Sequence, residues 1–281
     1  MSQWWIAMFS EFVGTAILIL LGNGVCAATS LKRMNANQPG KWVLIALGWG
    51  FAVFIGASVS AAMGGSGFLN PAALIMNAIS LSVNPESMGP VFGEGLVGVN
   101  LGSSELIAMS FFVMLIFEIL GAIFGQIILN TINFKFLKDK ENDLLTIRGM
   151  HCTAPSYKNK EDRATFFNFA YEFIGTFVLL GAILAFGKLS VDQEGAAIKL
   201  GSLSNLAVTF VIMSIGISLG SATGYAINPA RDLMPRTVFY FFVNAFRKDD
   251  VTKGICDWGY SWVPVAGPMA AGVLMGLFTL I

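Results

Sequence analysis

Charged residues are scarce in this chain. Asp, Glu, Lys and Arg make up 12% of its 281 residues, whereas 55% are hydrophobic; a soluble domain has about 25% charged residues. Basic and acidic residues balance at 17 each, so no positive excess points to a nucleic-acid partner. A chain with so much apolar surface cannot bury all of it in one soluble core. We therefore expect it to lie in a lipid bilayer.

Cysteine and histidine are also scarce. The three cysteines, Cys26, Cys152 and Cys256, are dispersed and odd in number, a pattern that indicates neither a disulfide framework nor a metal site. The single histidine, His151, stands beside Cys152 in a hydrophilic stretch. We expect both side chains to be solvated. No nucleophile, base and orienting group converge, so we predict no enzyme activity and no cofactor or metal.

Long apolar segments recur along the chain. Six of them are long enough to cross a hydrocarbon core of about 30 Å. They run over 4–28, 42–62, 105–130, 166–187, 200–219 and 262–281. Two shorter runs, from Pro71 to Ser80 and onward from Pro229, would extend roughly half as far as helices. They predict half-helices. The glycine-rich stretch 84–104 and the hydrophilic stretch 131–165 predict loops.

The two halves of the chain repeat each other. Glu-Phe-Val-Gly-Thr from Glu11 matches Glu-Phe-Ile-Gly-Thr from Glu172, and each half contains one Asn-Pro-Ala. Three full spans per half is an odd number, so the second half must be inverted in the bilayer. We predict an all-α membrane protein with six transmembrane helices and two re-entrant half-helices. Its single channel domain consists of the repeats 1–130 and 166–281 and the connecting loop 131–165.

Each Asn-Pro-Ala begins a helix at membrane depth, because Asn caps a helix N-terminus and Pro fits its first turn. In an inverted repeat the two N-termini meet near the midplane. Their partial positive charge repels cations and protons, while the amides of Asn70 and Asn228 can donate to a neutral hydroxyl. The alternative is that each Asn is only a cap. The candidate pore residues are Asn70, Pro71, Ala72, Asn228, Pro229 and Ala230.

This pattern resembles the aquaporin and glycerol-facilitator family, the major intrinsic proteins. The resemblance covers nearly the whole chain through the two Asn-Pro-Ala motifs, the Glu-Phe-x-Gly-Thr openings and the order of the spans. It implies a homotetramer in the plasma membrane, with one pore per subunit and both termini in the cytoplasm. That orientation puts the basic loop between 135 and 163 outside, against the positive-inside rule. It also implies that Glu11 and Glu172 accept hydrogen bonds from the re-entrant loops.

Matched residue by residue, the family's selectivity filter falls on Trp49, Gly216, Tyr225 and Arg231. An arginine within a membrane segment is functional by default, and the alternative for Arg231 is snorkelling from a helix end. The alternatives are lipid-interface anchoring for Trp49 and helix packing for Tyr225. Water-selective members have histidine at the position of Gly216. Asp232, directly after Arg231, resembles the glycerol-facilitator branch.

The resemblance therefore implies a passive channel for glycerol and related small neutral solutes, with some water conductance and exclusion of ions and protons. Trp49 and Tyr225 would take the carbons of a polyol, Arg231 and backbone carbonyls its hydroxyls, and Gly216 would widen the slot. A water-selective aquaporin is the alternative within the family. The competing class is an ion-coupled secondary transporter, because such transporters also contain inverted repeats with broken helices.

Overall fold

The structure, a computed structural model, describes residues 3–83, 103–158, 163–189 and 204–280, and no strand occurs among them. The helices are α1 (Gln3–Ser30), α2 (Lys41–Ala62), α3 (Pro71–Val83), α5 (Ser103–Ile132), α6 (Phe134–Lys138), α7 (Leu144–Gly149), α8 (Ala164–Leu189), α9 (Ser204–Ser218), α10 (Pro229–Phe246) and α11 (Val263–Phe278). Of these, α1, α2, α5 and α8 are long and apolar enough to cross a membrane. The predicted loop 84–104 and the start of the span 200–219 lie mostly outside the described residues.

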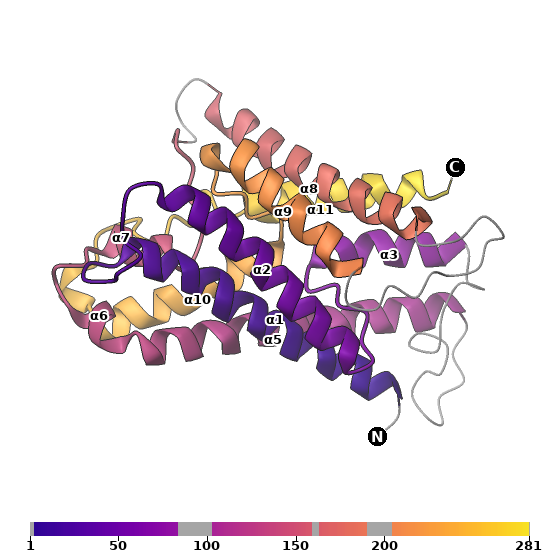
Figure 1. Ribbon diagram of the computed structural model, residues 1–281, viewed down its shortest axis with the longest axis horizontal. Helices are drawn as coiled ribbons and strands as arrows, with labels where there is room; N and C mark the ends of the chain where they lie inside the picture. Colours follow the sequence, from indigo (N-terminus) through magenta and orange to yellow (C-terminus); the bar gives the residue numbers. More distant parts are fainter. Residues whose placement is uncertain (1–2, 84–102, 159–162, 190–203, 281) are drawn as a thin grey trace.

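The helices form a bundle around two helices that begin in its middle (Figure 1). From there α3 and α10 extend in opposite directions, toward opposite ends of the molecule. The marked chain ends lie toward one end of the bundle, and α6 and α7 lie at the other. In the first half α1 packs against α2 and α5, and in the second half α8 packs against α9 and α11. The predicted fold, an inverted repeat with two re-entrant helices, is confirmed.

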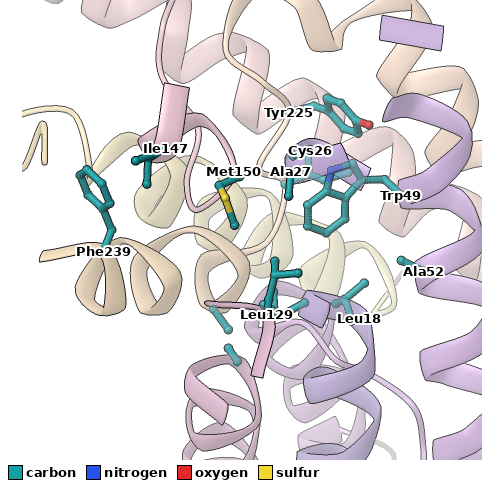
Figure 2. Close-up of a cluster of buried hydrophobic side chains, with 14 of the residues drawn as sticks. Leu18, Cys26, Ala27, Trp49, Ala52, Leu129, Ile147, Met150, Tyr225 and Phe239 are labelled. Atoms are coloured by element: carbon teal, nitrogen blue, oxygen red, sulfur yellow. The ribbon is translucent and has the colours of Figure 1, made fainter. Parts of the chain in front are cut away.

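Small residues let α1 and α5 cross closely. A Cβ atom added at Gly121 would collide with the backbone carbonyl oxygen of Phe12, and one added at Gly125 would collide with that of Ala16. Such glycines four residues apart allow two helix backbones to approach within a membrane, where packing rather than the hydrophobic effect drives association. Figure 2 shows part of the resulting core, in which Leu18 of α1 and Leu129 of α5 lie close to the indole of Trp49.

The second re-entrant helix is longer than predicted. α10 has 18 residues, whereas α3 has 13. At 1.5 Å per residue α10 extends about 27 Å, which is almost a full span. The polar residues Asp232 and Arg236 interrupt the apolar run, which is why the sequence indicated a short helix. Both side chains are buried and paired with each other, so the helix continues through them.

The connecting segment 131–165 is not a simple loop, which corrects the sequence prediction. It contains the end of α5, the short helices α6 and α7 and the start of α8, and its side chains Leu137, Ile147 and Met150 are buried. Arg247, just beyond α10, donates hydrogen bonds to the carbonyl oxygens of Leu137 at 2.8 Å and Asn142 at 3.3 Å. The segment is therefore anchored to one end of the bundle.

His151 and Cys152 are buried, so the expectation that they are solvated was wrong. The Nδ1 atom of His151 lies 2.8 Å from the carbonyl oxygen of Ile147, and because a carbonyl only accepts, Nδ1 carries the proton. The imidazole packs against the ring of Phe239, and its Nε2 atom has no partner in the described part of the chain. Burial lowers the pKa of His151 from 6.5 to about 4.

We expect the protein to lose stability as the pH falls from 6.5 toward 4. Above pH 6.5 the imidazole is neutral both folded and unfolded, but below it only the unfolded chain takes up the proton. The loss should reach about 2 kcal/mol at pH 5. Thermal unfolding in detergent at pH 7.5 and pH 5 would measure it. The variant His151→Phe should lack most of the pH dependence, and an equal drop in both proteins would contradict the assignment.

Candidate functional site

The two Asn-Pro-Ala corners contact each other reciprocally. The side-chain amide nitrogen of Asn70 donates to the carbonyl oxygen of Ile227 at 2.9 Å, and that of Asn228 donates to the carbonyl oxygen of Leu69 at 2.7 Å. Each carbonyl belongs to the residue just before the opposite asparagine. A side-chain amide has two N–H groups, so each asparagine retains one for a passing solute. Both asparagines line the same cavity.

The asparagine side-chain oxygens cap the two re-entrant helices. The Oδ1 atom of Asn70 accepts from the backbone N–H of Ala72 at 3.0 Å. The Oδ1 atom of Asn228 accepts from the N–H groups of Ala230 at 3.0 Å and Arg231 at 3.1 Å. Pro71 and Pro229 occupy the first helical positions. Capping and reciprocal donation therefore use different atoms of the same side chain, so the cap-only alternative is incomplete.

Two buried glutamates hold the strained loops that precede the corners. Glu11 accepts from the backbone N–H groups of Gly67, Phe68 and Leu69 at 2.8 to 3.1 Å. Glu172 accepts from those of Ala226 and Ile227 at 3.0 and 2.8 Å.

These loops contain backbone conformations that side chains other than glycine rarely adopt. Leu69 has φ 52° and Ile227 has φ 42°, which is unfavourable for the β-branched isoleucine. Such conformations persist only where their surroundings hold them. The carboxylates bind the N–H groups of Leu69 and Ile227, while the carbonyl oxygens of the same two residues accept from the asparagines of the opposite corners.

Glu118 of α5 is a supporting residue whose role the sequence did not reveal. Its Oε1 atom accepts from the backbone N–H of Asn70 at 2.9 Å, while its Oε2 atom has no partner among the described residues. The sequence showed only an acid in an apolar run. Its partner is 48 residues away, so nothing local indicated the contact.

Three of the four predicted filter residues line the cavity together, namely Trp49, Tyr225 and Arg231. The guanidinium carbon of Arg231 lies 4.2 Å from the centroid of the Trp49 ring. Arg231 is only 5% exposed, and in the described part of the chain its guanidinium donates to no protein acceptor. A buried cation stacked on an aromatic ring, with its donors unused, is well suited to bind solute oxygens.

Gly216 does not itself line the cavity, which corrects the expectation that it widens the slot directly. A Cβ atom there would lie 2.9 Å from Cζ and 3.0 Å from the hydroxyl oxygen of Tyr225. The tyrosine ring therefore occupies the space that a side chain at 216 would need. Trp42 supports this arrangement, because its Nε1 donates to the carbonyl oxygen of Gly216 at 3.0 Å and its ring meets that of Tyr225 edge-on.

Tyr225 presents its ring rather than its hydroxyl to the cavity. The hydroxyl lies 3.5 Å from the carbonyl oxygen of Ile45, at the limit of a hydrogen bond, and Ile45 is not a lining residue. We expect Tyr225→Phe to change solute permeation by less than about twofold, since a hydrogen bond this long contributes little. Solute uptake by vesicles containing the variant would test this. A tenfold loss would instead place the hydroxyl in contact with the solute.

Many of the other lining residues are apolar, among them Val208 and Ile212 of α9. Asn205 in the first turn of α9 is an exception that the sequence interpretation missed. Its side-chain nitrogen lies 3.2 Å from the hydroxyl of Ser58 on α2. A polar residue at the start of an apolar run was the only available signal. Ser66, which precedes the first corner, also lines the cavity.

Asp232, which follows Arg231 in the sequence, forms a fully buried ion pair with Arg236. Its Oδ1 atom accepts from Arg236 at 2.7 Å, and its Oδ2 atom accepts from the backbone N–H and hydroxyl of Thr153 at 2.7 and 2.6 Å. Arg236 also donates to the carbonyl oxygen of Cys256 at 2.7 Å. This network joins α10 to two connecting segments. It holds Arg231, the neighbour of Asp232, at the cavity.

The fold and site define a class of protein: a helical membrane protein with two opposed re-entrant helices meeting at a lined cavity. A sequence profile described as Major intrinsic protein matches residues 1–106 and 97–279. The chain belongs to the major intrinsic protein family.

Several named proteins are similar to this chain. A probable glycerol uptake facilitator protein of Mycoplasmoides gallisepticum is 38% identical over 98% of this chain and 96% of its own length. Glycerol uptake facilitator protein 3 of Lactiplantibacillus plantarum is 36% identical over 97% and 95%. The structure of the aquaglyceroporin from Plasmodium falciparum superposes with a TM-score of 0.68 at 27% identity, covering 98% of this chain and 95% of that one.

Proposed function

We propose that this chain is a passive channel for glycerol and related small neutral solutes, that it conducts some water, and that it excludes ions and protons. One observation carries the proposal: Trp49, Tyr225 and Arg231 line the same cavity as Asn70 and Asn228. The names of the similar proteins, glycerol uptake facilitators and an aquaglyceroporin, support the same solute.

The lining suits a molecule with one polar and one apolar edge. The rings of Trp49 and Tyr225 can take the C–H edge of glycerol, while the unused donors of Arg231 take its hydroxyl oxygens. Farther in, the free N–H groups of Asn70 and Asn228 meet the next hydroxyl. A solute that exchanges hydration for these fixed partners along its path crosses without a large desolvation barrier.

The same geometry disfavours cations. Two helix N-termini, each with a partial positive charge of about half an elementary charge, point at the middle of the cavity. Arg231 adds a full positive charge at the filter, and no acidic side chain is present among the described residues that line the cavity. A cation or hydronium ion is therefore repelled, whereas a neutral hydroxyl is bound.

The two competing functions fit the site less well. A water-selective filter needs a histidine at position 216, but the ring of Tyr225 occupies that space and the only histidine lies elsewhere. An ion-coupled transporter needs a coupling site and halves that move apart. Reciprocal bonds between the two corners instead tie the halves together.

The proposal includes the setting of the channel. We place the protein in the plasma membrane as a homotetramer with one pore per subunit, acting on solutes without transforming them. Large apolar side chains such as Phe112, Phe166 and Phe241 are more than 60% exposed, as expected for surfaces that face lipid or a neighbouring subunit.

Stopped-flow light scattering on proteoliposomes tests the function. Vesicles containing the protein should take up glycerol faster than empty vesicles, without saturation at low concentration and without an effect of an uncoupler. Glycerol uptake that saturates or collapses with the uncoupler would indicate a transporter. Fast water movement without glycerol entry would indicate a water-selective channel.

A further inference from the structure

The indole of Trp49 lies directly against the backbone of α1 at Gly22. A Cβ atom added at Gly22 would collide with Cζ3 and Cε3 of the indole and would lie 2.6 Å from Cη2. Only a glycine at position 22 is therefore compatible with the present position of the Trp49 indole. Gly22 is 27 residues before Trp49 in the sequence and does not line the cavity, so the sequence did not indicate it as a filter residue.

Cys26 lies one helical turn beyond Gly22, on the same face of α1. Cys26 and Trp49 belong to the same buried cluster. The indole Nε1 is buried and has no hydrogen-bond partner in the described part of the chain. Figure 2 shows Cys26 next to the indole. The thiol of Cys26 is itself buried. Gly22 and Cys26 thus both lie next to the indole of Trp49, one helical turn apart. We call these two residues the seat of the indole.

The position of the ring determines the position of the other filter groups. Arg231 stacks on the indole at 4.2 Å, so a shift of the ring also shifts the guanidinium or weakens its cation–π contact. Tyr225, by contrast, is held by Gly216, Gly220 and Trp42, in a seat of its own. The separation between Trp49 and Tyr225 therefore depends on how far α1 lets the indole retreat.

We propose that Gly22 and Cys26 are positioning residues that set the aperture of the filter, and with it the largest polyol that passes. This inference rests on the proposed function. A side chain at 22 pushes the indole into the cavity and narrows it. Removal of the thiol at 26 leaves space behind the indole, lets the ring retreat and widens the filter. The two changes have opposite effects on selectivity, which a general loss of packing would not produce.

Permeation of water, glycerol and a linear five-carbon polyol into proteoliposomes tests the proposal. Gly22→Ala should lower glycerol permeation by about tenfold, which corresponds to an added barrier of ~1.4 kcal/mol, and should lower water permeation less. Cys26→Ala should raise the ratio of five-carbon polyol to glycerol permeation. Gly24→Ala is the matched control, because the nearest atom to its added Cβ is 3.8 Å away.

A second substitution separates positioning from misfolding. In Gly22→Ala with Trp49→Phe the smaller ring no longer meets the added methyl group, so glycerol permeation should return toward that of Trp49→Phe alone. The proposal is overturned if Trp49→Phe rescues nothing, or if Gly22→Ala lowers water and glycerol permeation equally. If the unmodified protein conducts water but no glycerol, the proposed function fails. The seat is then still tested by the water permeation of Gly22→Ala and its rescue.

Discussion

Replacing Gly216 by histidine is expected to lower glycerol permeation by at least about tenfold and water permeation much less. The added Cβ alone would lie 2.9 Å from the ring of Tyr225 and 3.1 Å from the Cβ of Ala46. The tyrosine must therefore move toward Trp49 and Arg231. Overpacking of this kind costs about 1–3 kcal/mol, and a narrower slot excludes glycerol before it excludes water. Parallel measurements of osmotic water flow and glycerol uptake would show the difference.

The matched control is Ser218→His on the same helix. Ser218 is exposed on the outer surface of α9, so the same side chain is added away from the filter. That variant should retain both permeabilities. An equal loss of water and glycerol permeation in Gly216→His would show that position 216 does not affect the filter aperture.

Replacing Asp232 by alanine is expected to lower the free energy of unfolding by about 3–5 kcal/mol, the usual cost of removing one partner from a buried ion pair. Arg236 is fully buried and would lose its carboxylate partner, and the backbone N–H of Thr153 would lose its acceptor. Unfolding in detergent, followed by tryptophan fluorescence, would measure the loss. Permeation should fall as well, because α10 carries Arg231.

Asp249→Ala provides the comparison for this experiment. Asp249 is exposed in the short turn after α10, so its removal should change stability by no more than about 0.5 kcal/mol. If both variants lose the same small amount, the pair of Asp232 and Arg236 does not hold α10 in place.

Most of the fold could be predicted from the sequence, because lipid imposes simple requirements on a chain. A span needs about 20 apolar residues, and backbone at membrane depth must be helical unless it is buried or lines a wet cavity. The lengths of the apolar segments and the positions of the two Asn-Pro-Ala corners meet these requirements, and both can be read directly from the sequence. The length of an apolar run does not, however, show whether a helix continues through polar residues. The pairing of Asp232 with Arg236 extends α10 to 18 residues, and no run of hydrophobic residues signals that.

The site was predicted less completely. The sequence indicated Trp49, Tyr225 and Arg231 as candidate filter residues, and the structure places them at one cavity. It did not indicate that Gly216 makes room for the tyrosine ring instead of widening the slot itself. Nor did it indicate that His151, in a stretch of polar residues, is fully buried against Phe239. Phe239, which packs against His151, comes from a distant part of the chain. Tyr225 is close to Gly216 in the sequence, but only the path of the backbone between them decides that its ring fills the space beside Gly216.

The sequence by itself determined the class of this protein, the number and repeat of its apolar segments and the start of each re-entrant helix, because hydropathy and capping are local properties. Only the tertiary structure decided how the pieces meet. Asn70 bonds to Ile227 and Asn228 to Leu69 across more than 150 residues of sequence. The indole of Trp49 rests on Gly22, and Tyr225 on Gly216. Such contacts depend on close packing between helices, where tenths of an ångström determine which side chain fits.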